Sequence, residues 1–139
     1  MAVKKYIMKC RKVVEGKVSG EAIVTREAIN FYQVNPETGT IIEEGHELNG
    51  EKIGGKILVF PGDKGSSVVQ LDGLFQMAQK GNKPKGMIVK NLSTVLVSNA
   101  IIMEIPLVDS VDEEFYRVIS NGDWVEIDTD KEVLIIVKK

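Results

Sequence analysis

The sequence predicts an α/β fold with a mostly parallel central sheet, to which β-rich segments from both ends of the chain are added. Strand-like and helix-like segments alternate through the middle of the chain, from residue 56 to residue 109. Both ends instead carry alternating apolar and polar residues, the pattern of antiparallel or barrel-like strands. The 139 residues suffice for one core and contain no repeat or linker, so we expect a single domain over 1–139.

The first part of the chain is predicted to be strand and loop. Residues 12–25, KVVEGKVSGEAIVT, alternate around two glycines and indicate two strands joined by a turn. Residues 28–32, AINFY, are short and apolar and predict a further strand or strand end. Residues 33–56 are rich in Gly, Asn, Pro and Glu, which predicts a long irregular segment with a turn at NPETG and a brief strand at GTIIE.

The centre of the predicted sheet is the apolar run KILVF, residues 56–60, which suits a strand covered on both faces. A helix is predicted over residues 67–80, with Ser66 or Ser67 as its N-cap and Gly81 just past its end. Gly73 weakens that helix and so indicates close packing. Apolar residues at helical spacing predict the buried face of this helix: Val68, Leu71, Leu74, Phe75 and Ala78.

The remaining segments complete the alternation and the antiparallel end. KGMIVK, residues 85–90, is the next predicted strand, followed by a helix from about Ser93 to Met103 and a parallel strand in IPLVD, residues 105–109. VDEEFYRVI, residues 111–119, predicts a helix with acidic residues in its first turn. The last segment, residues 122–139, predicts a β-hairpin around TDK.

Composition excludes several functions. The formal net charge is −2, so no basic field favours nucleic acid. No apolar run is long enough for a bilayer and no signal peptide is recognisable, so we expect a cytoplasmic protein that binds no membrane. Cys10 is the only cysteine and is expected to be reduced and partly buried. With one cysteine and one histidine in the chain, we expect no self-contained structural metal site.

The motif GDKGSS, residues 62–67, links the predicted central strand to the first predicted helix. In α/β sheets, ligands bind beyond the carboxyl ends of strands, where helix N-termini present unpaired N–H groups. The motif is not a P-loop, because its lysine precedes the second glycine. Two interpretations stay open: a capped helix after a tight turn, or a loop that holds an anion or a reactive hydroxyl.

Other polar residues are ambiguous. His46 is either an exposed loop histidine or a group that contacts substrate from a mobile loop. No complete catalytic constellation is visible, because no His/Asp pair accompanies the serines and G-x-S-x-G is absent. Phe31, Tyr32 and Trp124 are expected to be core or interface anchors. Six carboxylates are expected to be solvated surface groups: Glu43, Glu44, Glu47, Asp112, Glu113 and Glu114.

The order of these segments resembles the swivelling-domain subunit of the aconitase X group. The resemblance covers about Val13 to Asp128. It depends on a G-x-x-x-G-E-A strand pair, the segment VNPETG, a histidine followed by ELNG, a strand followed by proline and G-S-S, and the later segment AIIMEIPLVD. It implies a swivelling β/β/α domain that acts as the small subunit of a two-subunit hydro-lyase, inactive alone.

The resemblance also assigns roles. Aconitase-type domains carry G-S-S-R at a strand-to-helix turn, where the first serine is the catalytic base. By that correspondence Ser66 is the candidate base, while Gly65, Ser67, Lys64 and His46 are candidate substrate-binding residues. Val68 stands where aconitase has arginine, which puts a carboxylate contact from that position in doubt.

The implied reaction is dehydration of (R)-5-phosphomevalonate to trans-anhydromevalonate 5-phosphate in an archaeal mevalonate route. A [4Fe–4S] cluster on a large partner subunit would polarise the leaving hydroxyl, and this chain would bind none. Three alternatives stay open: a related dehydratase subunit for another hydroxy acid such as hydroxyproline, a phosphohistidine swivelling domain, and a non-enzymatic interaction module. His46 lies in EGHELNG rather than Thr-Ser-His, which disfavours the phosphohistidine domain.

Overall fold

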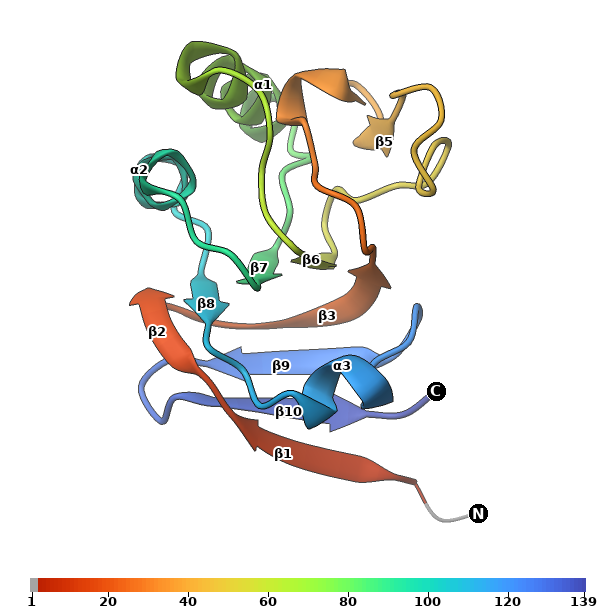
Figure 1. Cartoon of the computed structure of the whole chain (residues 1–139), viewed down its shortest axis with the longest axis vertical. Coiled ribbons are helices and arrows are strands. Elements are labelled where there is room, and N and C mark those ends of the chain that lie inside the picture. The colour runs from red at the N-terminus through yellow and green to blue at the C-terminus, as the bar shows by residue number, and fades with distance from the viewer. Residues whose placement is uncertain (1–2) are drawn as a thin grey trace.

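The structure is a computed structural model and describes residues 3–139. It contains one large sheet, one two-stranded sheet and four short helices within that range (Figure 1). None of these helices has both the length and the apolar composition needed to span a bilayer. The elements are β1 (Lys5–Lys9), β2 (Arg11–Val14), β3 (Lys17–Val24), the 3₁₀ helix η1 (Phe31–Gln33), β4 (Val34–Asn35), β5 (Thr40–Ile41), β6 (Ile57–Phe60), α1 (Ser67–Gln79), β7 (Gly86–Val89), α2 (Thr94–Ile102), β8 (Leu107–Asp109), α3 (Glu114–Val118), β9 (Trp124–Asp128) and β10 (Val133–Val137).

The large sheet has the order β1-β10-β9-β3-β6-β7-β8-β2. Strands β3, β6, β7 and β8 run parallel, whereas the other pairings are antiparallel. The two edge strands, β1 and β2, are consecutive in the chain and are separated only by Cys10. Because β1 pairs with β10 and β2 with β8, one bent segment joins both edges and the sheet curls into a barrel. This agrees with the predicted α/β class, including the barrel-like additions from both ends.

Strand β6 shows why its sequence is apolar throughout. Ile57 and Val59 pack into the barrel interior with residues of β9 and β10, whereas Leu58 and Phe60 face the layer of α1 and α2. All four side chains are buried, as expected for a central strand whose two faces are both covered. In Figure 1, α1 and α2 lie above the parallel strands, and β9, β10 and β1 form the opposite side of the barrel.

Most of the predicted elements are confirmed, including both long helices, the closing hairpin and the brief pairing of β4 with β5. AINFY forms no strand beyond an isolated parallel bridge between Ile29 and Asp63. Phe31–Gln33 instead form η1, and the Asn30 side chain caps it by accepting from the Tyr32 N–H. Propensity favoured a strand, but this local cap offers the backbone another partner. Strand β1 was not predicted, because its exposed lysines give only a weak pattern.

The predicted buried face of α1 is wrong in most of its positions. Leu74 is buried, but Val68 is 76% and Phe75 47% exposed. The helix is rotated because Gly73 faces η1: a Cβ at Gly73 would lie 2.5 Å from the carbonyl oxygen of Phe31. The expectation that Gly73 marks close packing is therefore confirmed, and it explains why the apolar spacing was misleading.

Candidate functional site

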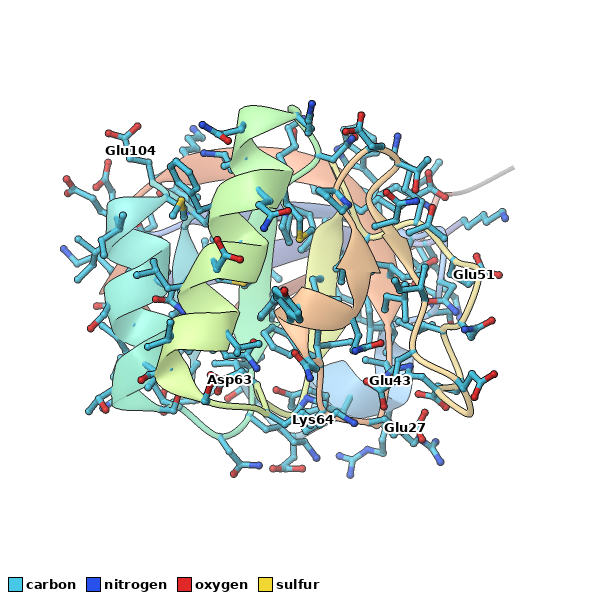
Figure 2. The ribbon with its side chains drawn as sticks, turned by 90° about the horizontal axis from the view of Figure 1, so that it is seen from above. Glu27, Glu43, Glu51, Asp63, Lys64 and Glu104 are labelled. Carbon is cyan, nitrogen blue, oxygen red and sulfur yellow. The ribbon has the colours of Figure 1, made fainter. Side chains whose placement is uncertain are left out.

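The candidate site lies where the parallel strands end at their carboxyl edge. The loop that leaves β6, residues 61–66, enters α1 there, and the loop that leaves β7 enters α2. Figure 2 looks down on α1 and α2 and shows Glu27, Glu43, Asp63 and Lys64 gathered at this edge, while Glu104 lies at the other end of the molecule. This is the position at which open parallel sheets bind ligands.

Backbone hydrogen bonds hold the GDKGSS loop between its neighbours. The N–H of Ile29 donates to the Gly62 carbonyl, and the N–H of Lys64 donates to the Ile29 carbonyl, each at 3.0 Å. On the other side, the Asn91 N–H donates to the Pro61 carbonyl at 2.8 Å. The loop is thus held by the segments that follow β3 and β7, so its shape depends on three strands rather than on a local turn.

Gly65 gives the loop its sharp bend into α1. Its φ is +106°, a backbone conformation that residues with a side chain rarely adopt. A Cβ there would lie 2.5 Å from the side-chain amide nitrogen, Nε2, of Gln70. Gln70 is fully buried and accepts a hydrogen bond from the Phe31 N–H at 3.0 Å. The position therefore requires glycine for both its conformation and its space.

Ser66 is the N-cap of α1, as predicted. Its Oγ accepts from the Val69 N–H at the long distance of 3.4 Å, and the side chain is exposed. Within residues 3–139 no group accepts the Ser66 hydroxyl proton. The first turn of α1 reads SVVQ and carries no charge, so the positive end of the helix dipole is not neutralised locally. Ser67 is the first residue of α1 and is also exposed.

Asp63, inside the same motif, has a structural partner that the sequence did not reveal. Its Oδ1 accepts the hydroxyl of Ser93 at 2.8 Å, and Ser93 is in turn the N-cap of α2. The carboxylate thereby ties the GDKGSS loop to the second helix. Sequence reasoning treated the loop as a unit with α1 alone and placed Ser93 only as the approximate start of the second helix.

Lys64 is paired rather than free. Its Nζ lies 2.6 Å from Oε2 of Glu43, and its side chain is 45% exposed. Glu43 belongs to the irregular segment after β5, which brings that segment to the same edge as the GDKGSS loop, as Figure 2 shows. The carboxylate was expected to be a solvated surface group, but its side chain is only 23% exposed and holds the lysine.

His46 is buried, and backbone groups occupy both of its ring nitrogens. Its Nδ1 accepts from the Leu48 N–H at 3.0 Å, so the ring proton lies on Nε2, which is 3.1 Å from the Ala28 carbonyl. The side chain is 1% exposed. In this arrangement the ring offers no nitrogen to a ligand, and it holds in place the segment that precedes Ile29.

Potential metal ligands are not gathered into one site in the part of the chain that the structure describes. Within residues 3–139 no three His, Cys, Asp or Glu side chains form a possible metal site. The sole cysteine, Cys10, is free and buried at the bend between β1 and β2. Burial, together with the nearby carboxylates of Glu132 and Asp109, raises the pKa of its thiol to about 11, so it is a poor thiolate ligand.

The comparison with protein families decides the classification. The family model of the aconitase X swivel domain matches residues 7–136. The chain belongs to this family. The phosphomevalonate dehydratase small subunit of Archaeoglobus fulgidus is 41% identical to it over 88% of this chain and 92% of the relative. The protein of the same name from Methanothrix thermoacetophila is 40% identical over 93% of each chain.

A solved structure supports the same classification. The chain is similar to the crystal structure of aconitase X, holo-form, from Thermococcus kodakaraensis, with a TM-score of 0.86 and 36% identity. The match covers 96% of this chain and 99% of the solved one. An aconitase X swivel domain is therefore present over nearly the whole chain, which confirms the family resemblance and the fold class inferred from the sequence.

Proposed function

We propose that this chain is the small subunit of a two-subunit phosphomevalonate dehydratase, a hydro-lyase that removes water from (R)-5-phosphomevalonate to give trans-anhydromevalonate 5-phosphate in a mevalonate pathway. The relatives named as small subunits of this enzyme support the proposal, and they match nearly the whole chain. The observation that carries it in this chain is an exposed serine at the start of α1 whose hydroxyl proton has no acceptor within residues 3–139.

Ser66 is the catalytic base in this proposal. Dehydration requires removal of a proton from the carbon next to the one that bears the leaving hydroxyl. Ser66 can receive that proton only if its oxygen is first an alkoxide, so its own proton must pass to solvent water beforehand. The exposed N–H groups of the first turn of α1 favour the resulting negative charge at that position. A closed, water-poor site strengthens this effect, and closure would have to come from the partner subunit.

The substrate-binding roles follow from the same geometry. Gly65 opens the backbone for close approach, and Ser67 adds a second hydroxyl beside Ser66. Lys64 would contact substrate only after giving up its ion pair with Glu43. This is feasible because the pair is partly exposed and such pairs contribute little net stability. His46 would affect substrate binding only indirectly, by holding the segment around Ala28 in place, because both of its ring nitrogens are hydrogen-bonded to the backbone.

The partner in this proposal is a large subunit, and the assembly is a heterodimer or a higher oligomer. A [4Fe–4S] cluster, if resident in the enzyme, belongs to that subunit, because the residues described here provide no ligand set for it. When bound, such a cluster supplies Lewis-acid polarisation of the leaving hydroxyl. The isolated chain is accordingly proposed to have neither a cluster nor dehydratase activity.

The test is co-expression of this chain with a candidate large subunit, followed by anaerobic assay of the purified complex. We expect co-purification, and dehydration of 5-phosphomevalonate only by the complex. A parallel assay with hydroxyproline as substrate tests the alternative that the chain belongs to a related dehydratase. Turnover of hydroxyproline alone would reject the proposed substrate. Absence of any turnover in a stable complex that carries its cluster would favour an interaction module.

A further inference from the structure

A second feature at the carboxyl edge is a cavity of about 430 Å³ next to the GDKGSS loop. It lies where β3, β6 and β7 end, and its wall includes Pro61, the residue that begins the loop carrying Ser66. The polar residues that line it come from distant parts of the chain: Thr25 and Arg26 after β3, Lys90 after β7, and Tyr116 on α3. Its size is within the usual range for small-molecule sites.

Two cations line this cavity. Arg26 and Lys90 are exposed, and within residues 3–139 neither forms an ion pair with a carboxylate. Lys90 is held in position, because its Nζ lies 4.4 Å from the centroid of the Tyr116 ring. A lysine that packs on an aromatic ring keeps its charge and its three N–H donors near one place.

Two of the neighbouring acids, Glu47 and Asp109, already have hydrogen-bond donors. Glu47 accepts the Thr25 hydroxyl and the Arg26 backbone N–H through one carboxylate oxygen, and these bonds hold the pKa of Glu47 below its usual value. Asp109 receives two hydrogen bonds from the Arg11 guanidinium, at 2.7 and 2.8 Å. Among the residues that line the cavity itself, the charged side chains are those of Arg26 and Lys90.

The wall of the cavity also includes a neutral phenol, that of Tyr116. Burial, with the nearby charges of Glu113 and Asp109, raises the pKa of Tyr116 to about 12. The phenol therefore keeps its proton at neutral pH and can donate a hydrogen bond. Two cations and a phenolic O–H match an anion with two negative charges and several acceptor oxygens better than they match a single carboxylate.

We propose that the cavity between Arg26, Lys90 and Tyr116 binds the phosphoryl group of the substrate, a phosphate monoester. The carbon skeleton then extends past Pro61 toward the start of α1, where Ser66 faces the reacting carbon. This inference rests on the proposed function for its substrate, but the affinity of the cavity for a phosphate monoester can be measured without any turnover.

The first experiment measures binding directly. The ¹⁵N-labelled full chain is titrated with methyl phosphate, and separately with acetate at equal ionic strength. We expect saturable shifts of the amides of residues 25–26, 90 and 116 with methyl phosphate, and much smaller ones with acetate. Equal responses to both anions, or shifts at other sites only, would overturn the proposal.

Lys90→Gln is the informative variant, and Lys85→Gln is its matched control. The two lysines flank β7 at opposite ends, so each substitution removes one exposed positive charge, but only Lys90 lines the cavity. We expect Lys90→Gln to weaken methyl phosphate binding about 10-fold, as for loss of one charge-assisted hydrogen bond, and Lys85→Gln to leave it unchanged. Equal effects of the two variants would show that methyl phosphate responds only to the net charge of the protein. That result would contradict the proposed site.

The second experiment uses the assembled enzyme and separates the two proposals. If the wild-type complex dehydrates 5-phosphomevalonate, we expect Lys90→Gln and Arg26→Gln to raise KM about 10-fold or more while kcat changes less, because the phosphoryl group does not react. Unchanged KM in both variants would reject the cavity and leave the function intact. A wild-type complex without activity, together with selective methyl phosphate binding, would reject the function and keep the cavity.

Discussion

Ser66 and Ser93 occupy equivalent places at the carboxyl edge of the sheet but have different surroundings. Each follows a parallel strand and caps the next helix, α1 or α2. Ser93 accepts from the Leu96 N–H at 3.0 Å and donates its proton to Asp63, so its hydroxyl is used twice. Ser66 accepts from the Val69 N–H at 3.4 Å, and nothing within residues 3–139 takes its proton.

The difference shows that the cap alone does not identify a reactive serine. Both serines satisfy an orphan N–H at a helix start, which is sufficient for stability. Only Ser66 is exposed with a free proton, next to a glycine at positive φ. The partners of the hydroxyl, rather than its place on a helix, distinguish the candidate base from the structural cap.

The largest expected effect belongs to Ser66→Ala in the assembled enzyme. We expect kcat to fall by at least roughly 10²-fold, the lower end for losing a general base. Stability should fall by only about 0.5–1 kcal/mol, because the cap bond is long and exposed. Turnover and urea unfolding of the same preparation measure both quantities.

Gly65→Ala should have the next largest effect, through the conformation of the loop. The new Cβ would occupy a positive-φ position and meet the buried amide of Gln70, so we expect about 1–3 kcal/mol of destabilisation. Gly45→Ala is the matched control, because Gly45 has φ +79° but nothing within 4 Å of its Cβ position. Equal losses in urea unfolding would mean that the Gln70 contact contributes nothing.

Ser93→Ala tests the other side of the comparison. It removes a cap and leaves Asp63 without its hydroxyl donor, so we expect about 1–2 kcal/mol of destabilisation, more than for Ser66→Ala. Turnover per folded complex should fall less than in Ser66→Ala. A larger loss of kcat than in Ser66→Ala, without loss of stability, would reverse the roles assigned to the two serines.

Much of the fold could be predicted, because it depends on local patterns. The apolar run of β6, the N-cap of α1 and the turn residues of the closing hairpin are all local signals. Strand β1 and the exposed face of α1 could not be predicted, because they depend on barrel closure and on the backbone of Phe31 pressing against Gly73. Such tertiary contacts override periodicity.

The candidate site was predictable in position but not in detail. GDKGSS was visible as a strand-to-helix loop, and the family resemblance assigned Ser66. The partners of the neighbouring residues could not be seen in the sequence. Lys64 pairs with Glu43, 21 residues away, and Asp63 accepts a hydrogen bond from Ser93, 30 residues away. His46 was the least predictable, because its two backbone partners form only once the loops around it have folded.

The smallest expected effect is that of Ser67→Ala, and it tests the alignment of the motif. Ser67 is exposed at the first position of α1, so we expect a stability change within about 0.5 kcal/mol. Its proposed role is secondary, so kcat should fall clearly less than in Ser66→Ala, and the order of the two variants matters more than either size. If Ser67→Ala abolished turnover and Ser66→Ala kept it, the assignment would be wrong by one residue. If both variants stayed active, Ser66 would be a cap like Ser93, and the base would have to come from the large subunit.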